Sequence, residues 1–171
     1  MIVAIMCVGA VSAQEWSVGL RAGSGVQAVG QVTTSGKGYL EARFGASWNN
    51  PIVSTMTNVN NNIYAESGRV MADFTILHNW RIAEMDWTPR AGRWFFDAGV
   101  GANVGGKAHY AYVGLAGMAR LGFSFNSVPL SLAIDWTPSF GPGILYVGGY
   151  NDAFYNELGL ANLGITCTFH F

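Results

Sequence analysis

The chain has 171 residues and a formal net charge of −1, which suits a single domain and gives no basic surplus for binding nucleic acid. Charged residues make up only 11% of the sequence, against roughly 25% in ordinary soluble domains, whereas 50% are hydrophobic and 23 are glycine. A water-facing surface needs more charge than this, and a helical membrane protein needs apolar runs of about 18 residues, which 14–171 lacks. The hydrophobic character must therefore be carried by alternation along strands.

Residues 1–13 are predicted to be a secretory signal peptide. The segment is apolar through most of its length and ends on small residues that suit cleavage before Gln14, although no Lys or Arg precedes its apolar core. A lipoprotein anchor at Cys7 is a weaker alternative, because Met6 stands where a small residue is expected. Removal of Cys7 would leave Cys167 as the only cysteine, which excludes an intrachain disulfide and a Cys-based metal site.

Eight segments of the remaining chain alternate between apolar and polar residues, and turn-rich segments separate them. In the first segment, for example, Trp16, Val18 and Leu20 share one parity and form an apolar face. The predicted strands cover 15–22, 26–32, 39–48, 69–81, 93–104, 110–125, 130–137 and 157–171. Two long segments rich in polar residues or in Gly and Pro, 49–67 and 138–156, are predicted to be loops.

An even number of antiparallel strands suits closure into a barrel with both termini at one end. We therefore predict an all-β fold for 14–171, an eight-stranded antiparallel up-and-down transmembrane β-barrel. Counting the connections places the links 33–38, 82–92 and 126–129 at the terminal end and both long loops at the far end. Outer-membrane barrels have this asymmetry, with short periplasmic turns and longer extracellular loops.

The positions of the charges indicate which face of the predicted barrel lies inside. Twelve charged residues lie at the alternate strand positions that carry polar residues, and none lies at the apolar positions. The cations among the twelve are all arginine. Balanced arginines and carboxylates suit a closed lumen in which each buried charge has a partner, so we expect a lumen plugged by side chains. Ordinary solvated charges on a soluble β-domain are the alternative. The predicted lumen charges are Glu15, Arg21, Glu41, Arg43, Arg69, Asp73, Arg81, Arg93, Asp97, Arg120, Asp135 and Glu157.

Aromatic residues gather near both ends of the predicted strands. The terminal-side ends carry Trp16, Trp80, Trp94, Phe123 and Phe125, and the far-side ends carry Trp48 and Trp136. Two aromatic girdles of this kind bound the apolar band of a membrane barrel. A single ring of aromatics would more often be core packing, but girdles at both ends favour an outer surface that faces lipid.

Three features of the sequence carry a resemblance to a known family. They are the stretch 80–106, with an aromatic pair before Gly99-Val100-Gly101, the stretch 128–138, and the terminal Phe171. Together they resemble the small eight-stranded outer-membrane β-barrel proteins of Gram-negative bacteria, such as OmpX and the transmembrane barrel of OmpA, in the porin-like superfamily. The resemblance implies an assembly signal in the last strand, matched here by Ile165, Cys167, Phe169 and Phe171.

The resemblance also implies an integral outer-membrane location with both termini in the periplasm, and outer-membrane lipid and the barrel assembly machinery as partners. We expect a non-enzymatic protein that contributes to envelope structure or surface interaction through its extracellular loops, with no cofactor, no metal and no nucleic-acid partner. A narrow channel or lateral route for small solutes is one alternative. A lipid-modifying enzyme is another, but only His109 lies near the outer rim and no Ser stands beside it at strand spacing, so no catalytic residue is predicted.

Overall fold

The structure is a computed structural model that describes residues 15–34, 36–48, 57–59, 62–64, 70–88, 90–107, 110–147, 150–156 and 162–171. None of these residues belongs to a helix long and apolar enough to cross a lipid bilayer. The strands are β1 (Trp16–Gly23), β2 (Gly25–Thr33), β3 (Gly38–Ser47), β4 (Thr57–Val59), β5 (Asn62–Tyr64), β6 (Met71–Met85), β7 (Gly92–Lys107), β8 (Tyr110–Phe125), β9 (Leu130–Trp136), β10 (Ser139–Val147), β11 (Tyr150–Asn156) and β12 (Leu163–His170). The predicted signal peptide, residues 1–13, lies outside the described residues.

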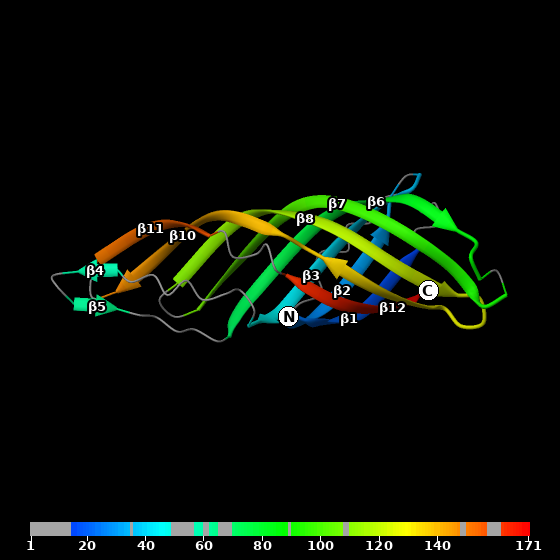
Figure 1. Ribbon diagram of the computed structural model, residues 1–171, viewed down its shortest axis with the longest axis horizontal. Coiled ribbons are helices and arrows are strands. Elements are labelled where there is room, and N and C mark those ends of the chain that lie inside the picture. The colour runs from blue at the N-terminus through cyan, green and yellow to red at the C-terminus, as the bar shows by residue number, and fades with distance from the viewer. Residues whose placement is uncertain are drawn as a thin grey trace.

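Eight of these strands close into an antiparallel ring in the order β1-β2-β3-β6-β7-β8-β9-β12, and pairing of β12 with β1 completes it. Figure 1 shows the C-terminus at the same end of the ring as the β6–β7 and β8–β9 turns. Each strand of the ring lies beside the ring strands that precede and follow it in the chain. The structure therefore confirms the predicted fold class, an all-β, eight-stranded, antiparallel up-and-down barrel.

The strands form because polar and apolar residues alternate, so that each strand has one face inside the ring. In β6, Asp73, Thr75 and Asn79 are buried, whereas Phe74 and Ile76 between them are exposed on the outer face. The same pattern recurs around the ring. The interior therefore contains polar side chains and the outer surface apolar ones, which is the reverse of a water-soluble domain.

β9 and β10 together follow β8 along its length, with an interruption at Pro138. β8 pairs with β9 through its terminal-side half and with β10 through the other half. Proline has no N–H to donate, but its carbonyl accepts a hydrogen bond of 2.8 Å from the N–H of Gly117. β10 pairs in turn with β11, and this hairpin extends beyond the ring (Figure 1). The predicted loop over 138–156 is therefore wrong, because β8 is long enough to offer this segment a partner. The other predicted loop, 49–67, contains the pair β4 and β5.

A register shift in β6 changes which residues face the interior near the terminal end. β6 continues past its predicted end at Arg81, so the connection to β7 is shorter than the predicted 82–92. Pairing with β7 shifts directly after Arg81, which pairs with Asp97, and Glu84 then pairs with Phe95. Paired residues point to the same side of a sheet, and Asp97 and Phe95 share a parity. Arg81 and Glu84 therefore face the same side, although alternation alone would separate them.

Glycines on the inner wall leave room for large side chains of the neighbouring strand. A Cβ atom at Gly164 of β12 would lie 2.6 Å from Cζ of Arg21, whose guanidinium crosses over this position. Gly122 of β8 lies in the same way beneath the ring of Phe95. The wall is thin at these points because two large side chains cannot share one level of a narrow lumen.

Replacing Gly164 with Val should destabilise the barrel by about 3–5 kcal/mol, because the new side chain displaces Arg21 and breaks its buried ion pair with Asp135. Urea unfolding of the refolded protein, followed by tryptophan fluorescence, measures this change. Gly30→Val is the matched control, since it adds the same side chain at a position where a Cβ atom meets nothing within 4 Å. Equal stability of Gly164→Val and the unchanged protein would contradict this account of the inner wall.

Candidate functional site

Seven of the twelve charged residues on the polar parity are buried inside the ring. They are Arg21, Glu41, Arg43, Asp73, Asp97, Arg120 and Asp135. Buried charges are tolerated only where ion pairs and hydrogen bonds compensate them, so the partners of each charge decide whether such an interior is stable. Asp73, for example, accepts a hydrogen bond of 2.7 Å from Nε2 of Gln27. Most of the others belong to one connected network.

Asp135 of β9 binds arginines from three other strands. Its Oδ1 lies 2.7 Å from Nε of Arg21 on β1 and 3.5 Å from Nη1 of Arg43 on β3. Its Oδ2 lies 3.7 Å from Nη2 of Arg120 on β8 and also accepts a hydrogen bond from the hydroxyl of Thr166. β3 and β9 are four strands apart in the eight-stranded ring, so the pair of Arg43 and Asp135 spans the lumen from wall to wall.

Glu41 of β3 is the second carboxylate of this network, and its side chain is 0% exposed. It accepts hydrogen bonds of 2.7 and 3.0 Å from Arg120 and one of 2.5 Å from Nε of Arg43. Nε2 of Gln31 donates a further bond of 2.6 Å. Arg43 and Arg120 therefore each contact both carboxylates. We call this set of side chains the lumen network: Arg21, Glu41, Arg43, Arg120 and Asp135.

Tyr39 and Asp97 connect the lumen network to the terminal end of the barrel. The hydroxyl of Tyr39 accepts a hydrogen bond of 3.1 Å from Nη1 of Arg120 and donates one of 2.8 Å to Oδ2 of Asp97. Oδ1 of Asp97 accepts a bond of 2.8 Å from Nε of Arg81. The paired charges thus continue from the middle of the lumen to its opening.

Arg93 does not lie where the sequence analysis placed it. Its side chain is 65% exposed and lies 3.9 Å from a carboxylate oxygen of Glu84 and 3.7 Å from one of Asp86. Arg93 has the parity of the inward-facing residues of β7, but it lies at the very start of that strand, beside the β6–β7 turn. Its side chain therefore reaches the rim of the barrel and not the lumen. Arg69 and Glu157, also predicted as lumen charges, lie outside the residues whose side chains the structure describes.

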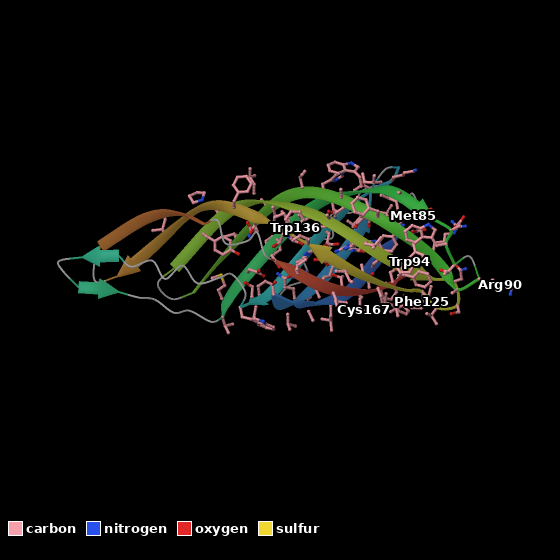
Figure 2. All side chains as sticks on the ribbon, viewed as in Figure 1. Met85, Arg90, Trp94, Phe125, Trp136 and Cys167 are labelled. Atoms are coloured by element: carbon pink, nitrogen blue, oxygen red, sulfur yellow. The ribbon has the colours of Figure 1, made fainter. Side chains whose placement is uncertain are left out.

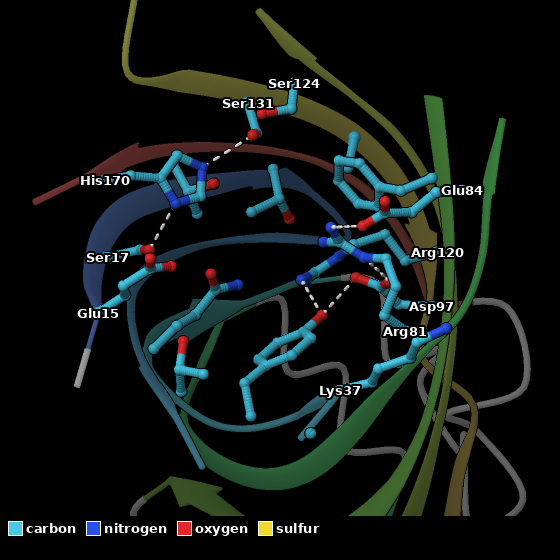
Figure 3. A pocket seen from close by; sticks show the side chains of 18 of the residues that line it. Glu15, Ser17, Lys37, Arg81, Glu84, Asp97, Arg120, Ser124, Ser131 and His170 are labelled. Carbon is cyan, nitrogen blue, oxygen red and sulfur yellow. Dashed lines mark hydrogen bonds and ion pairs between the residues drawn. The ribbon is translucent and has the colours of Figure 1, made fainter. Parts of the chain in front are cut away.

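The terminal end of the barrel opens into a cavity of about 400 Å³, which we call the mouth cavity. Four of the twelve charged residues line it: Glu15, Arg81, Asp97 and Arg120. The side chain of Arg81 is 31% exposed. Lys37 and Glu84 line it as well, together with His170 (Figure 3). Lys37 is not among the predicted lumen charges because it lies in a predicted turn. Glu84 is not among them because only the register shift turns this residue inward.

A chain of hydrogen bonds joins three strands where the ring closes, on one wall of the mouth cavity. Nδ1 of His170 on β12 lies 2.7 Å from Oγ of Ser17 on β1. Its Nε2 lies 2.8 Å from Oγ of Ser131 on β9. The alternation of the last strand predicts an inward His170, but the two serines come from distant parts of the chain. Figure 3 shows the imidazole ring between them.

The outer face is apolar around the ring. Leu20 of β1, Phe44 of β3, Leu115 of β8 and Ile134 of β9 are each more than 60% exposed. The aromatic residues predicted as girdles also lie on this face, and Figure 2 shows Trp94 and Phe125 close to the β6–β7 turn and Trp136 farther toward the opposite end. The exposed or partly exposed girdle residues are Trp16, Trp48, Trp80, Trp94, Phe123, Phe125 and Trp136.

The last strand has its apolar residues on the same outer face. Ile165, Phe169 and Phe171 are exposed, and Cys167 is a partly exposed free cysteine. The N–H of Phe171 donates a hydrogen bond of 2.9 Å to the carbonyl of Trp16, and its ring packs edge-on against Phe169 with centroids 5.2 Å apart. The final residue therefore still pairs with the first strand of the ring.

Neither protein-family models, nor curated proteins, nor solved structures match this chain. Its function must be argued from the geometry of the barrel itself. The observations available are the apolar outer face, the lumen network and the mouth cavity. His109, the rim histidine weighed for catalysis, lies outside the described residues.

Proposed function

We propose that this chain is an integral outer-membrane β-barrel protein of the small, plugged type, with both termini in the periplasm. It has no catalytic role in this proposal and contributes to envelope structure or surface interaction through the connections at its far end. One observation carries the proposal: charged side chains are buried inside the ring while large apolar side chains are exposed outside it. OmpX and the barrel of OmpA, which the sequence resembles, are outer-membrane proteins of this architecture.

The apolar outer face supports a lipid environment on energetic grounds. Soluble monomers rarely expose contiguous apolar patches larger than a few hundred Å². Here exposed Leu, Ile, Val and Phe side chains occur on every strand of the ring. Burial of one such side chain contributes about 1.5–3 kcal/mol, so the whole face favours transfer into lipid by tens of kcal/mol. Ring closure also pairs the backbone groups of the strands, which a bilayer requires.

An arginine introduced in the middle of the outer face tests whether lipid or water surrounds the barrel, because it lowers stability only in lipid. Ile134→Arg should reduce the stability of the barrel in lipid vesicles by about 2–4 kcal/mol, the expected effect of an arginine near the middle of a bilayer. The folded fraction along a urea titration can be read from the faster gel migration of unboiled folded barrel. Val128→Arg, at an exposed position in the β8–β9 turn, is the control and should change stability by less than about 1 kcal/mol. A soluble barrel would tolerate both substitutions equally.

The lumen network supports a plugged barrel rather than a channel. Its side chains come from β1, β3, β8 and β9 and meet across the lumen, with Arg43 and Asp135 pairing from opposite walls. Eight strands enclose a lumen that side chains alone can fill. Solute passage would need these buried pairs to separate, which leaves uncompensated charges in a confined space.

Purified barrel in a planar bilayer should therefore show no steady single-channel conductance. Arg43→Ser combined with Asp135→Ser should produce measurable conductance, because both side chains that span the lumen are then short. Folded protein must be verified for both samples by heat-modifiable gel migration. Steady conductance of the unchanged protein would overturn the plug and favour the channel alternative. Lipid-modifying activity that disappears in His109→Ala would instead overturn the non-enzymatic proposal.

The residue pattern of the last strand supports the proposal that the outer-membrane barrel assembly machinery inserts this protein. Ile165, Cys167, Phe169 and Phe171 alternate on the outer face, in the pattern that the resemblance implies for recognition. Phe171 is 73% exposed, donates one backbone hydrogen bond to Trp16 and packs edge-on against Phe169. Its large aromatic ring thus adds little to the folded barrel.

Deletion of Phe171 should impair insertion into the outer membrane much more than it reduces the stability of barrel that has already folded. The amount of protein in outer-membrane fractions measures the first effect, and urea unfolding of refolded protein measures the second. Deletion should lower the stability by about 1 kcal/mol, the contribution of one lost backbone hydrogen bond. Phe140→Ala, which removes an exposed outer-face ring from β10, is the matched control and should insert normally. Equal loss of insertion in both variants would contradict the assembly role.

A further inference from the structure

The mouth cavity carries an inference beyond the proposed function, because its charged groups are arranged as a binding site. Its floor is formed by Tyr39, Asp97 and Arg120, whose polar groups are bonded to one another or to the lumen network. Its volume of about 400 Å³ falls within the usual range for small-molecule sites, about 300–1,000 Å³. Hydroxyl groups line the cavity between two walls. Lys37 and Arg81 lie on one wall, together with the carboxylates of Glu84 and Asp97 that bind Arg81, and Glu15 lies on the other (Figure 3).

One wall presents a cation that the protein holds in place. The guanidinium of Arg81 lies 4.2 Å from the ring centroid of Phe95 and donates to Asp97 through Nε at 2.8 Å. Its Nη1 donates to Glu84 at 3.2 Å, so these bonds leave Nη2 available for a ligand. Lys37 lies on the same wall (Figure 3). In the described part of the chain, the ion pairs on this wall join Arg81 to carboxylates and do not include Lys37. A ligand carboxylate would meet one fixed and one adaptable cation here.

The opposite wall presents an acid. Figure 3 shows Glu15 beside Ser17 and below His170, across the cavity from Lys37 and Arg81. Among the residues that the structure describes, Glu15 has no cation within 4 Å. The hydroxyl of Ser17, which is bonded to His170, adds a hydrogen-bonding group next to this carboxylate. A ligand ammonium would find its partner on this wall.

From this arrangement we infer that the mouth cavity binds a small zwitterion of the amino-acid or short-peptide class, with its carboxylate at Lys37 and Arg81 and its ammonium at Glu15. Two features distinguish this ligand class from a simple anion. The cavity lining has acids as well as cations, so its overall charge attracts an anion only weakly. Among the charged residues that line the cavity, Lys37 and Glu15 are the two without an ion-pair partner in the described part of the chain. They have opposite signs and lie on opposite walls.

Isothermal titration calorimetry of the purified barrel in a nonionic detergent tests the inference. The probes are glycine, γ-aminobutyrate and diglycine, whose charges are separated by increasing distances. Acetate and ethylammonium carry only one of the two charges, and inorganic phosphate is the anion control. At least one zwitterion should bind at least tenfold more tightly than acetate, ethylammonium and phosphate. Absence of zwitterion binding, or equal or tighter binding of any single-charge probe or of phosphate, would overturn the inference.

Two substitutions at exposed positions identify the site. Glu15→Gln and Lys37→Gln should each weaken binding of the zwitterion about tenfold, the effect of losing one charged hydrogen bond. Arg90→Gln removes an exposed charge outside the cavity and should leave binding unchanged. Unchanged binding in both cavity variants would place the ligand elsewhere and contradict the site. Failure of this inference leaves the membrane proposal intact, because the Ile134→Arg comparison involves no ligand.

Discussion

The pairing of buried charges inside the ring is the constraint on which the rest of this structure depends. Asp135 and Glu41 hold three arginines between them, and every one of these side chains is almost completely buried. Removing one partner of such a pair costs about 3–5 kcal/mol, because the remaining charge is left without compensation. The network joins β1, β3, β8 and β9, so it also sets the distance between opposite walls of the barrel. The strands that supply the charges are thus tied together from inside.

The same constraint explains the glycines of the inner wall and the apolar outer face. An arginine that reaches across a narrow lumen needs space beside its own strand, and Gly164 provides that space for Arg21. Once polar side chains occupy the interior, the apolar residues of the alternating strands can only face outward. Water would solvate this outer face poorly, and the proposed lipid environment rests on that property.

The two halves of the lumen differ because the charged network separates them. On the far side, the buried side chains of Leu77, Ala116 and Met118 form an apolar cluster. On the terminal side, the mouth cavity remains open and is lined mainly by hydroxyl and charged groups. The bulge after Arg81 contributes to this difference by turning Glu84 inward, where it helps to fix the guanidinium of Arg81. The lumen network can therefore close the middle of the barrel while the mouth cavity at the terminal end stays open to a ligand.

The sequence by itself determined the fold class and the side of each strand that faces inward. Side chains alternate strictly along a strand, so the parity of Arg21, Glu41 and Asp135 follows from local sequence wherever pairing is regular. Local sequence contains no information about stagger between strands, and the partner of each charge depends on that stagger. Asp135 meets Arg21 and Arg43 only because strands more than 90 positions apart in the chain lie at matching heights in the ring.

Only the tertiary structure decided the details at the ends of the strands. Alternation placed Arg93 inside, but a strand that reaches the rim exposes its inward positions to water. It gave no reason to turn Glu84 inward, because a bulge reverses parity without a clear mark in the sequence. The sequence also predicts a loop where β10 and β11 form. Glycine and proline are typical of turns, but here β8 offers the segment backbone partners. Parity is a local property of the chain, whereas register, bulges and strand ends depend on which neighbour each strand finds.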